Sequence, residues 1–159
     1  MPSPVGELVL VGAADVLCGL YFGPRDQATT GPWGDDRSCE WDPHTLPHVR
    51  RQLDEYFCGQ RTGFEVDLAL AGTDFQRRVW RELCNIPYGT TISYGQLAES
   101  IGQPSASRAV GSANGRNRIA IIIPCHRVVA RGGRLGGYSA GLDRKATLLR
   151  LENASVSLS

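Results

Sequence analysis

Two capping boxes in the second half of the chain constrain its fold more than any other feature. Thr73 is followed three positions later by Gln76, and Ser93 is followed in the same way by Gln96. In such a pair, each side chain bonds a backbone N–H group that the first helical turn leaves free, so helices are predicted to begin at both places. Gly102 is suited to end the second helix, because glycine readily takes the left-handed conformation that follows many helices.

A third helix is expected directly after this turn. Ser105 can cap it, and Asn114-Gly115 can end it. Its side chains are unusually small, at Ala106, Ala109 and Ala113, so its backbone can lie close to another surface. Two short helices across a tight turn with glycine are typical of a helix-turn-helix, although helical hairpins are also common inside protein cores.

The first half of the chain predicts a smaller α+β unit. Apolar runs and alternation favour strands over residues 7–11 and 16–22, with a turn at Gly12. Apolar residues at helical spacing then predict a helix that ends near Cys58. Alternating residues over 64–68 predict a further strand.

Charge divides unevenly between the two domains that this pattern predicts, residues 1–71 and residues 72–159. The first holds five arginines against eleven acidic residues, a net charge of −6. The second holds twelve basic residues against five acidic ones, a net charge of +7. A basic domain favours a polyanionic partner such as nucleic acid, but a charge-complementary contact between the domains explains the pattern equally well.

Composition excludes several classes of protein. No apolar run approaches the ~18 residues that a membrane-spanning helix needs, and the first residues do not form a signal peptide. Five cysteines are too few for a disulfide scaffold and odd in number, which favours a reducing compartment. Arginine greatly outnumbers lysine, as expected of a GC-rich genome, so we expect a protein of the bacterial cytoplasm.

Cys125 is the candidate nucleophile. Residues 119–123 form a continuous apolar run that predicts a buried strand, and Cys125 follows it, just before a glycine-rich loop. Because the thiolate is the reactive form and a free cysteine has a pKa of ~8.5, the thiol needs a base or a positive field. His126 and Glu152 are candidates for the base and its orienting carboxylate. The alternative is a small residue packed in the core, which the residue type alone favours.

Cys39, His44 and His48 suggest a competing zinc site, with the spacing C-x4-H-x3-H. A structural zinc site usually takes four ligands, and the sequence offers no obvious fourth one nearby. Cys18 or Cys58 would have to be brought in by the fold. Zinc binding is therefore the weaker interpretation.

The sequence PCHRVV at 124–129 resembles the active-site signature of the O6-alkylguanine-DNA alkyltransferases. The resemblance continues, in order and spacing, through GTDFQ at 72–76, IPYG at 86–89, SYGQL at 93–97, RAVG at 108–111 and GYS at 137–139. It implies an α+β fold, with a small ribonuclease-H-like α/β domain at the N-terminus. The C-terminal domain would be helical and winged-helix-like, and would contain the helix-turn-helix.

The resemblance also implies roles in the chemistry. Cys125 would accept the alkyl group. His126, acting through a water, and Glu152 would keep it as a thiolate. Asn117 would brace the turn between the recognition helix and the active-site strand.

Other matching residues would bind the damaged DNA. Tyr94 would press on the flanking phosphate and offer its hydroxyl to guanine N3, and Arg108 would enter the base stack in place of the flipped base. The Val128 carbonyl would accept from the guanine amine, the Ser139 amide would donate to O6, and Tyr138 would line the pocket. The small side chains of the third helix would face the minor groove: Ala106, Ala109 and Ala113.

The reaction implied is direct repair, in which the protein binds the minor groove, flips O6-alkylguanine out of the duplex and takes its alkyl group irreversibly. O4-alkylthymine is a second possible substrate. The implied partner is double-stranded DNA, with no membrane, no cofactor and no metal. We expect a monomer, with cooperative binding on DNA left open.

Three rival functions remain. Alkyltransferase-like proteins flag damaged bases but carry tryptophan where this chain has Cys125. A transcription regulator would need an effector or dimerisation domain, which the sequence does not suggest. A Cys-His hydrolase would use the same reactive groups without the DNA-facing residues.

Overall fold

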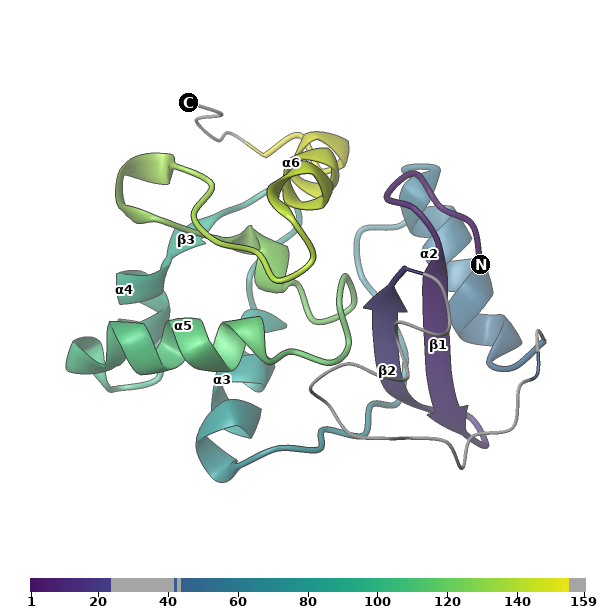
Figure 1. Ribbon diagram of the computed structural model, residues 1–159, viewed down its shortest axis with the longest axis horizontal. Coiled ribbons are helices and arrows are strands. Elements are labelled where there is room, and N and C mark those ends of the chain that lie inside the picture. Colours follow the sequence, from purple (N-terminus) through teal and green to yellow (C-terminus); the bar gives the residue numbers. More distant parts are fainter. Residues whose placement is uncertain (24–41, 43, 155–159) are drawn as a thin grey trace. The chain divides into compact units, whose positions relative to one another are not determined.

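The computed structural model describes residues 1–23, 42 and 44–154, which form two compact units (Figure 1). Unit 1 comprises Met1–Leu70 and Arg118–Ala120, and unit 2 comprises Ala71–Asn117 and the chain from Ile121 onward. The described part of unit 1 contains a hairpin and a helix, whereas unit 2 is mainly helical. The predicted α+β class is confirmed, while the domain boundary at residues 71 and 72 stays a prediction.

An antiparallel hairpin forms the centre of unit 1. Strand β1 (Leu8–Ala13) pairs with β2 (Val16–Phe22), so both predicted strands are present. The turn is not at Gly12, as predicted, but at residues 14 and 15, where Ala14 has a φ of 51°. Gly12 lies inside β1 at a register shift, where a Cβ would come within 2.6 Å of Leu46. A glycine in a strand can therefore mark close packing instead of a turn.

Helix α2 (Pro47–Phe57) lies against this hairpin (Figure 1). It ends as predicted, with Cys58 as the C-cap and Gly59 in the left-handed region at a φ of 71°. Residues 64–68 do not form the predicted strand, because Leu68 makes only an isolated parallel bridge to Leu17. The buried Gln52 of α2 instead bonds both backbone groups of Glu65, at 2.8 and 2.9 Å.

Both capping boxes of unit 2 are present, at Thr73 and Ser93. They begin α3 (Asp74–Leu83) and α4 (Tyr94–Ser100). Gly102 ends α4 as predicted, with a φ of 73°. Its N–H donates to Glu99 and that of Gln103 donates to Ala98, the two bonds of a Schellman motif.

The third predicted helix begins later than expected. Pro104–Ala106 form a short 3-10 turn, η1, and α5 runs over Ser107–Gly115 with no side-chain cap. The α4–η1–α5 segment is the predicted helix-turn-helix, and α4 and α5 lie side by side in Figure 1. On the other side, Trp80 Nε1 of α3 donates to the carbonyl of Ala113 at 2.9 Å, which fixes the end of α5.

Residues 119–123 are buried but do not form the predicted strand. Ile119 makes a single parallel bridge to Leu20, residues 120–122 form a turn, and Ile121 has a φ of 70°. A left-handed conformation is unfavourable for a β-branched residue, so the surrounding packing must hold it in place. A continuous apolar run is compatible with any buried backbone, and here it is a turn.

The remaining elements of unit 2 follow this turn. A 3-10 helix, η2 (Cys125–Arg127), leads into β4 (Val128–Val129), which pairs in parallel with β3 (Ile92–Ser93). A short helical turn, η3 (Arg131–Gly133), precedes the final helix α6 (Leu142–Leu151). Within the described ranges, no helix is long and apolar enough to cross a membrane.

Candidate active site

The turn before Cys125 is tight and braced by a side chain. The Cys125 N–H donates to the carbonyl of Ile123 at 2.8 Å, and Pro124 between them has φ −81° and ψ 61°, the geometry of an inverse γ-turn. Asn117 Nδ2 donates to the same carbonyl at 2.8 Å and to Cys125 Sγ at 3.1 Å. The predicted candidates Asn117 and Cys125 are thus brought together, with the cysteine only 3% exposed.

A second asparagine holds the other side of Cys125. Asn114, buried near the end of α5, donates from Nδ2 to the Cys125 carbonyl at 3.3 Å. From the sequence, Asn114 is expected only to end the helix. Asn114 near the end of α5 and Asn117 just after the helix therefore hold the carbonyl and the sulfur of the candidate nucleophile.

His126 and Glu152 form a fully buried pair. His126 Nε2 lies 2.9 Å from Glu152 Oε1, with neither side chain exposed. Because a carboxylate can only accept, the proton lies on Nε2 and Nδ1 presents a lone pair. Nδ1 has no hydrogen-bond partner within the described part of the chain. Burial lowers the pKa of His126 more than Glu152 raises it, so the imidazole is neutral at pH 7.

Arg127 also binds Glu152, a role that the sequence pattern does not predict. Its Nε donates to Glu152 Oε2 and its Nη2 to Oε1, both at 2.9 Å. Its Nη1 donates to the carbonyl of Ile86 at 2.6 Å. The resulting two-point contact with the carboxylate is buried and charge-assisted.

Lys145 is a second residue of the site for which the sequence pattern predicts no role. Its side chain is fully buried, and Nζ donates to the carbonyls of Val128 at 2.6 Å, Gly137 at 3.2 Å and Leu135. Burial lowers its pKa to about 8. The sequence does not predict that a lysine in a mostly apolar helix is buried in this way. Its partners are backbone carbonyls, which every residue has.

The pKa of Cys125 is raised, although the resemblance implies a pKa low enough for a thiolate. Burial raises the pKa of the thiol, and the hydrogen bond from Asn117, the influence of Tyr138 and the charge of Lys145 lower it by less. This balance favours the thiol in the protein without DNA, whereas the resemblance implies a standing thiolate.

The predicted substrate-binding residues surround this centre. Val128 is buried, and its carbonyl already accepts from Lys145. The Tyr94 hydroxyl reaches the carbonyl of Gly137 at 3.5 Å, and burial raises its pKa. Tyr138 is half-buried and contributes to the acidity of the thiol, whereas Ser139 is exposed.

The predicted DNA-facing residues divide into two groups. Arg108 and Ala109 are exposed on α5, and Ala106 is half-buried in η1, outside the helix. Ala113 is only 2% exposed, so its methyl group packs inside unit 2 and cannot line a groove of DNA. Helical spacing placed Ala113 on the same stripe, but α3 covers that end of the helix through Trp80.

The described residues do not support the competing zinc site. His48 lies at the start of α2, His44 lies in the turn before that helix, and Cys39 lies outside the described residues. Where the chain is described, no three His, Cys, Asp or Glu side chains are grouped as metal ligands.

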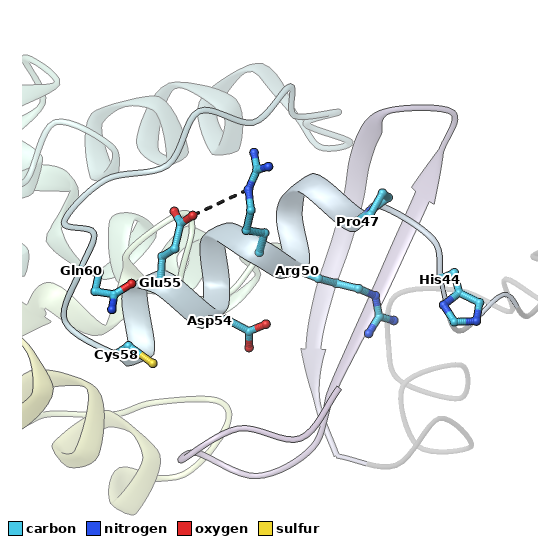
Figure 2. Close-up of a pocket in the computed structure, with 8 residues that line it drawn as sticks. His44, Pro47, Arg50, Asp54, Glu55, Cys58 and Gln60 are labelled. Carbon is cyan, nitrogen blue, oxygen red and sulfur yellow. Dashed lines mark ion pairs between the residues drawn. The ribbon is translucent and has the colours of Figure 1, made fainter.

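A pocket of about 520 Å³ lies along α2 in unit 1 (Figure 2). Basic and acidic side chains line it together, among them Arg50 and Asp54, and Figure 2 marks the 3.7 Å ion pair between Arg51 and Glu55. It contains none of the catalytic or DNA-facing candidates.

Two family models match consecutive parts of the chain. The DNA-binding domain of 6-O-methylguanine DNA methyltransferase matches residues 74–154, and the ribonuclease-like domain of the same proteins matches residues 1–70. The chain belongs to the 6-O-methylguanine DNA methyltransferase family. The resemblance noted in the sequence is therefore confirmed.

Individual relatives agree with this membership. The methylated-DNA–protein-cysteine methyltransferase of Mycobacterium leprae is 48% identical, over 98% of this chain and 92% of that protein. Its counterpart from Methanosarcina mazei is 55% identical, over 97% and 95%. The crystal structure of Mycobacterium tuberculosis OGT in complex with DNA is similar at 47% identity and a TM-score of 0.85, covering 96% of this chain and 90% of that one.

Proposed function

We propose that this protein repairs DNA by moving the alkyl group of O6-alkylguanine onto Cys125, acting as a methylated-DNA–protein-cysteine methyltransferase. The observation that carries the proposal is the braced, buried Cys125 within a chain of this family. Duplex DNA is the partner, as for the M. tuberculosis relative whose structure contains DNA. The bacterial cytoplasm is the proposed compartment.

The chemistry requires Cys125 to lose its proton first. The Nδ1 lone pair of His126 is the acceptor, through a water in the arrangement that the resemblance implies, and Glu152 holds the ring in the required tautomer. The thiolate then attacks the sp3 carbon, an S–C bond forms and the C–O bond breaks. The electron pair of that bond returns to O6, which becomes a carbonyl as the guanine ring takes up a proton.

The product explains single use of the protein. S-alkylcysteine is a thioether, which offers no easy route back to the thiol. Each molecule therefore repairs one lesion, and no cofactor takes part in the proposed steps. Asn117 and Asn114 keep the sulfur and carbonyl of Cys125 in place during the attack.

DNA handling is assigned to residues around this centre. Arg108, exposed on α5, enters the base stack, and the exposed Ala109 allows close approach to the minor groove. Tyr94 and Tyr138 line the base pocket, and the Ser139 amide donates to O6. The Val128 carbonyl accepts from the guanine amine through the lone pair that Lys145 leaves open.

An oligonucleotide carrying a labelled methyl group on guanine O6 tests the proposal. We expect one methyl group per protein, found by mass spectrometry on the peptide that contains Cys125. Cys125→Ala, which removes only the sulfur, should take up no label. Label on Cys18, Cys39, Cys58 or Cys84, or no transfer by the wild type, would contradict the proposal.

A further inference from the structure

The carboxylate of Glu152 is bonded from several directions. His126 Nε2 and Arg127 Nη2 meet Oε1, each at 2.9 Å, and Arg127 Nε meets Oε2 at 2.9 Å. The N–H of Gly89 adds a bond to Oε2 at 3.3 Å. The side chains of His126 and Glu152 are fully buried, and that of Arg127 is 7% exposed. The charges of Arg127 and Glu152 therefore cancel inside the protein.

Without Arg127, the buried carboxylate of Glu152 would favour protonation of the imidazole beside it. Burying one uncompensated negative charge is costly, so the pair would bind a proton, and the imidazole is the group that takes it most readily. An imidazolium has no lone pair and cannot accept the thiol proton. The base would then be lost at neutral pH.

We infer that Arg127 is a positioning residue that keeps His126 neutral, with its proton on Nε2 toward Glu152 and its Nδ1 lone pair free for the proton of Cys125. The inference deepens the proposed function and rests on it. Two features of Arg127 contribute separately. Its charge balances the carboxylate, and its planar fork fixes both carboxylate oxygens, so that Oε1 faces the ring.

Other titratable groups near the cluster do not replace Arg127. Lys145 of α6 also lowers the pKa of His126, but its Nζ is bound to carbonyls, not to Glu152. Cys84 at the end of α3 and Tyr88 of the 86–89 turn both have raised pKa values, so both are neutral at pH 7. Cys125 is a thiol for the same reason. The Tyr88 ring also faces the Arg127 guanidinium, 5.8 Å from its centre.

The rate of benzyl transfer from free O6-benzylguanine, followed against pH, tests the inference without involving DNA binding. In Arg127→Met we expect the acidic midpoint of the profile to rise by about one pH unit or more, because the uncompensated carboxylate favours the imidazolium. Below both midpoints the rate should fall about tenfold for each unit by which the midpoint rises, and the loss should disappear as the pH is raised above the new midpoint. Arg127→Lys should keep the midpoint but lower the rate at every pH, since it retains the charge and loses the fork.

Arg150→Met is the matched control, because Arg150 is exposed on α6, and its profile should follow the wild type. A purely structural role for Arg127 would lower all rates with no shift of the midpoint. That result in folded Arg127→Met would overturn the inference.

A second measurement needs neither a variant nor activity. Nitrogen NMR of the wild-type protein reports the protonation of each histidine ring, and His126 should show the neutral form with the proton on Nε2 at neutral pH. An imidazolium there would overturn the inference even if Arg127→Met does not fold. If instead the wild type transfers no alkyl group while His126 is neutral, the proposed function fails and the role of Arg127 in setting the proton stands.

Discussion

Burial opposes ionisation at Cys125, and this opposition determines when the residue can react. The thiol is 3% exposed, so the cost of placing a charge there outweighs the help of Asn117, Tyr138 and Lys145. A thiol with a raised pKa reacts slowly with oxidants and small alkylating agents, because the thiolate is the reactive form. We therefore place loss of the proton after the damaged base is bound, when His126 can accept it.

Alkylation by iodoacetamide measures this acidity directly, because its rate follows the thiolate fraction. The rate at Cys125, read from its own peptide, should give a midpoint above the ~8.5 of a free thiol. Asn117→Ala should raise the midpoint further, since the hydrogen bond from Asn117 favours the thiolate. N-acetylcysteine is the reference. A midpoint below that of the reference would mean that the standing thiolate exists after all.

Lys145 links stability to pH. Its pKa is about 8 in the folded protein and near its ordinary 10.5 when unfolded, so unfolding takes up a proton between these values. The contribution of Lys145 to stability is thus fully present above pH 10.5 and is lost as the pH falls to about 8. Compared with Lys145→Met, the wild-type side chain should gain about 1–3 kcal/mol of unfolding free energy over this interval.

Urea unfolding at several pH values tests this, with both proteins also carrying Cys125→Ala so that thiolate formation does not contribute. If the difference in unfolding free energy between the two proteins stays constant or falls as the pH rises, burial does not disfavour the charged form of Lys145. Lys145→Met should also loosen the 134–139 segment, where Leu135 and Gly137 lose their partner, and hydrogen exchange would report it.

At the scale of elements, the sequence predicts where helices begin, because those signals are local. It does not predict the conformation of the buried backbone. Capping boxes fixed the starts of α3 and α4, because each uses groups within four residues of chain. The apolar run at 119–123 predicts a strand, yet the segment forms a turn. Apolar side chains indicate that a segment is buried, but they do not determine its φ and ψ angles. Lys145 bonds backbone carbonyls, as does Nη1 of Arg127 at Ile86, and a backbone partner leaves no pattern in the side chains.

The turn over residues 86–89 gives an element-scale test. Gly89 has a φ of 73°, and a Cβ there would lie 2.8 Å from the carbonyl oxygen of Glu152. Gly102 has the same φ of 73° with nothing within 4 Å, so it is the matched control. Alanine at Gly102 should cost about 1 kcal/mol of unfolding free energy, and alanine at Gly89 clearly more. Only Gly89→Ala should also slow alkyl transfer, because it displaces Glu152. Equal effects at both positions would contradict this role of the close contact.

At the scale of the whole chain, charge divides as −6 for residues 1–71 and +7 for residues 72–159. Charge alone did not distinguish a DNA partner from a contact between domains. Family membership favours DNA, and the exposed Arg108 and Arg116 near α5 are available to it. Phosphate binding of this kind releases counterions, so duplex repair should slow by more than tenfold between about 50 mM and about 200 mM salt, while the reaction with free O6-benzylguanine stays constant.

Arg108 separates base flipping from chemistry. A base must leave the stack before its O6 substituent can reach a buried thiol, at a cost of a few kcal/mol, and a side chain that fills the gap offsets part of that cost. Arg108→Ala should therefore slow repair of duplex DNA tenfold or more, yet change the rate with free O6-benzylguanine less than about twofold. Arg108→Lys keeps the charge without the planar group, so an intermediate rate on duplex DNA would assign the remainder to stacking. Equal losses on both substrates would place Arg108 in the chemistry of the site and remove it from the flipping step.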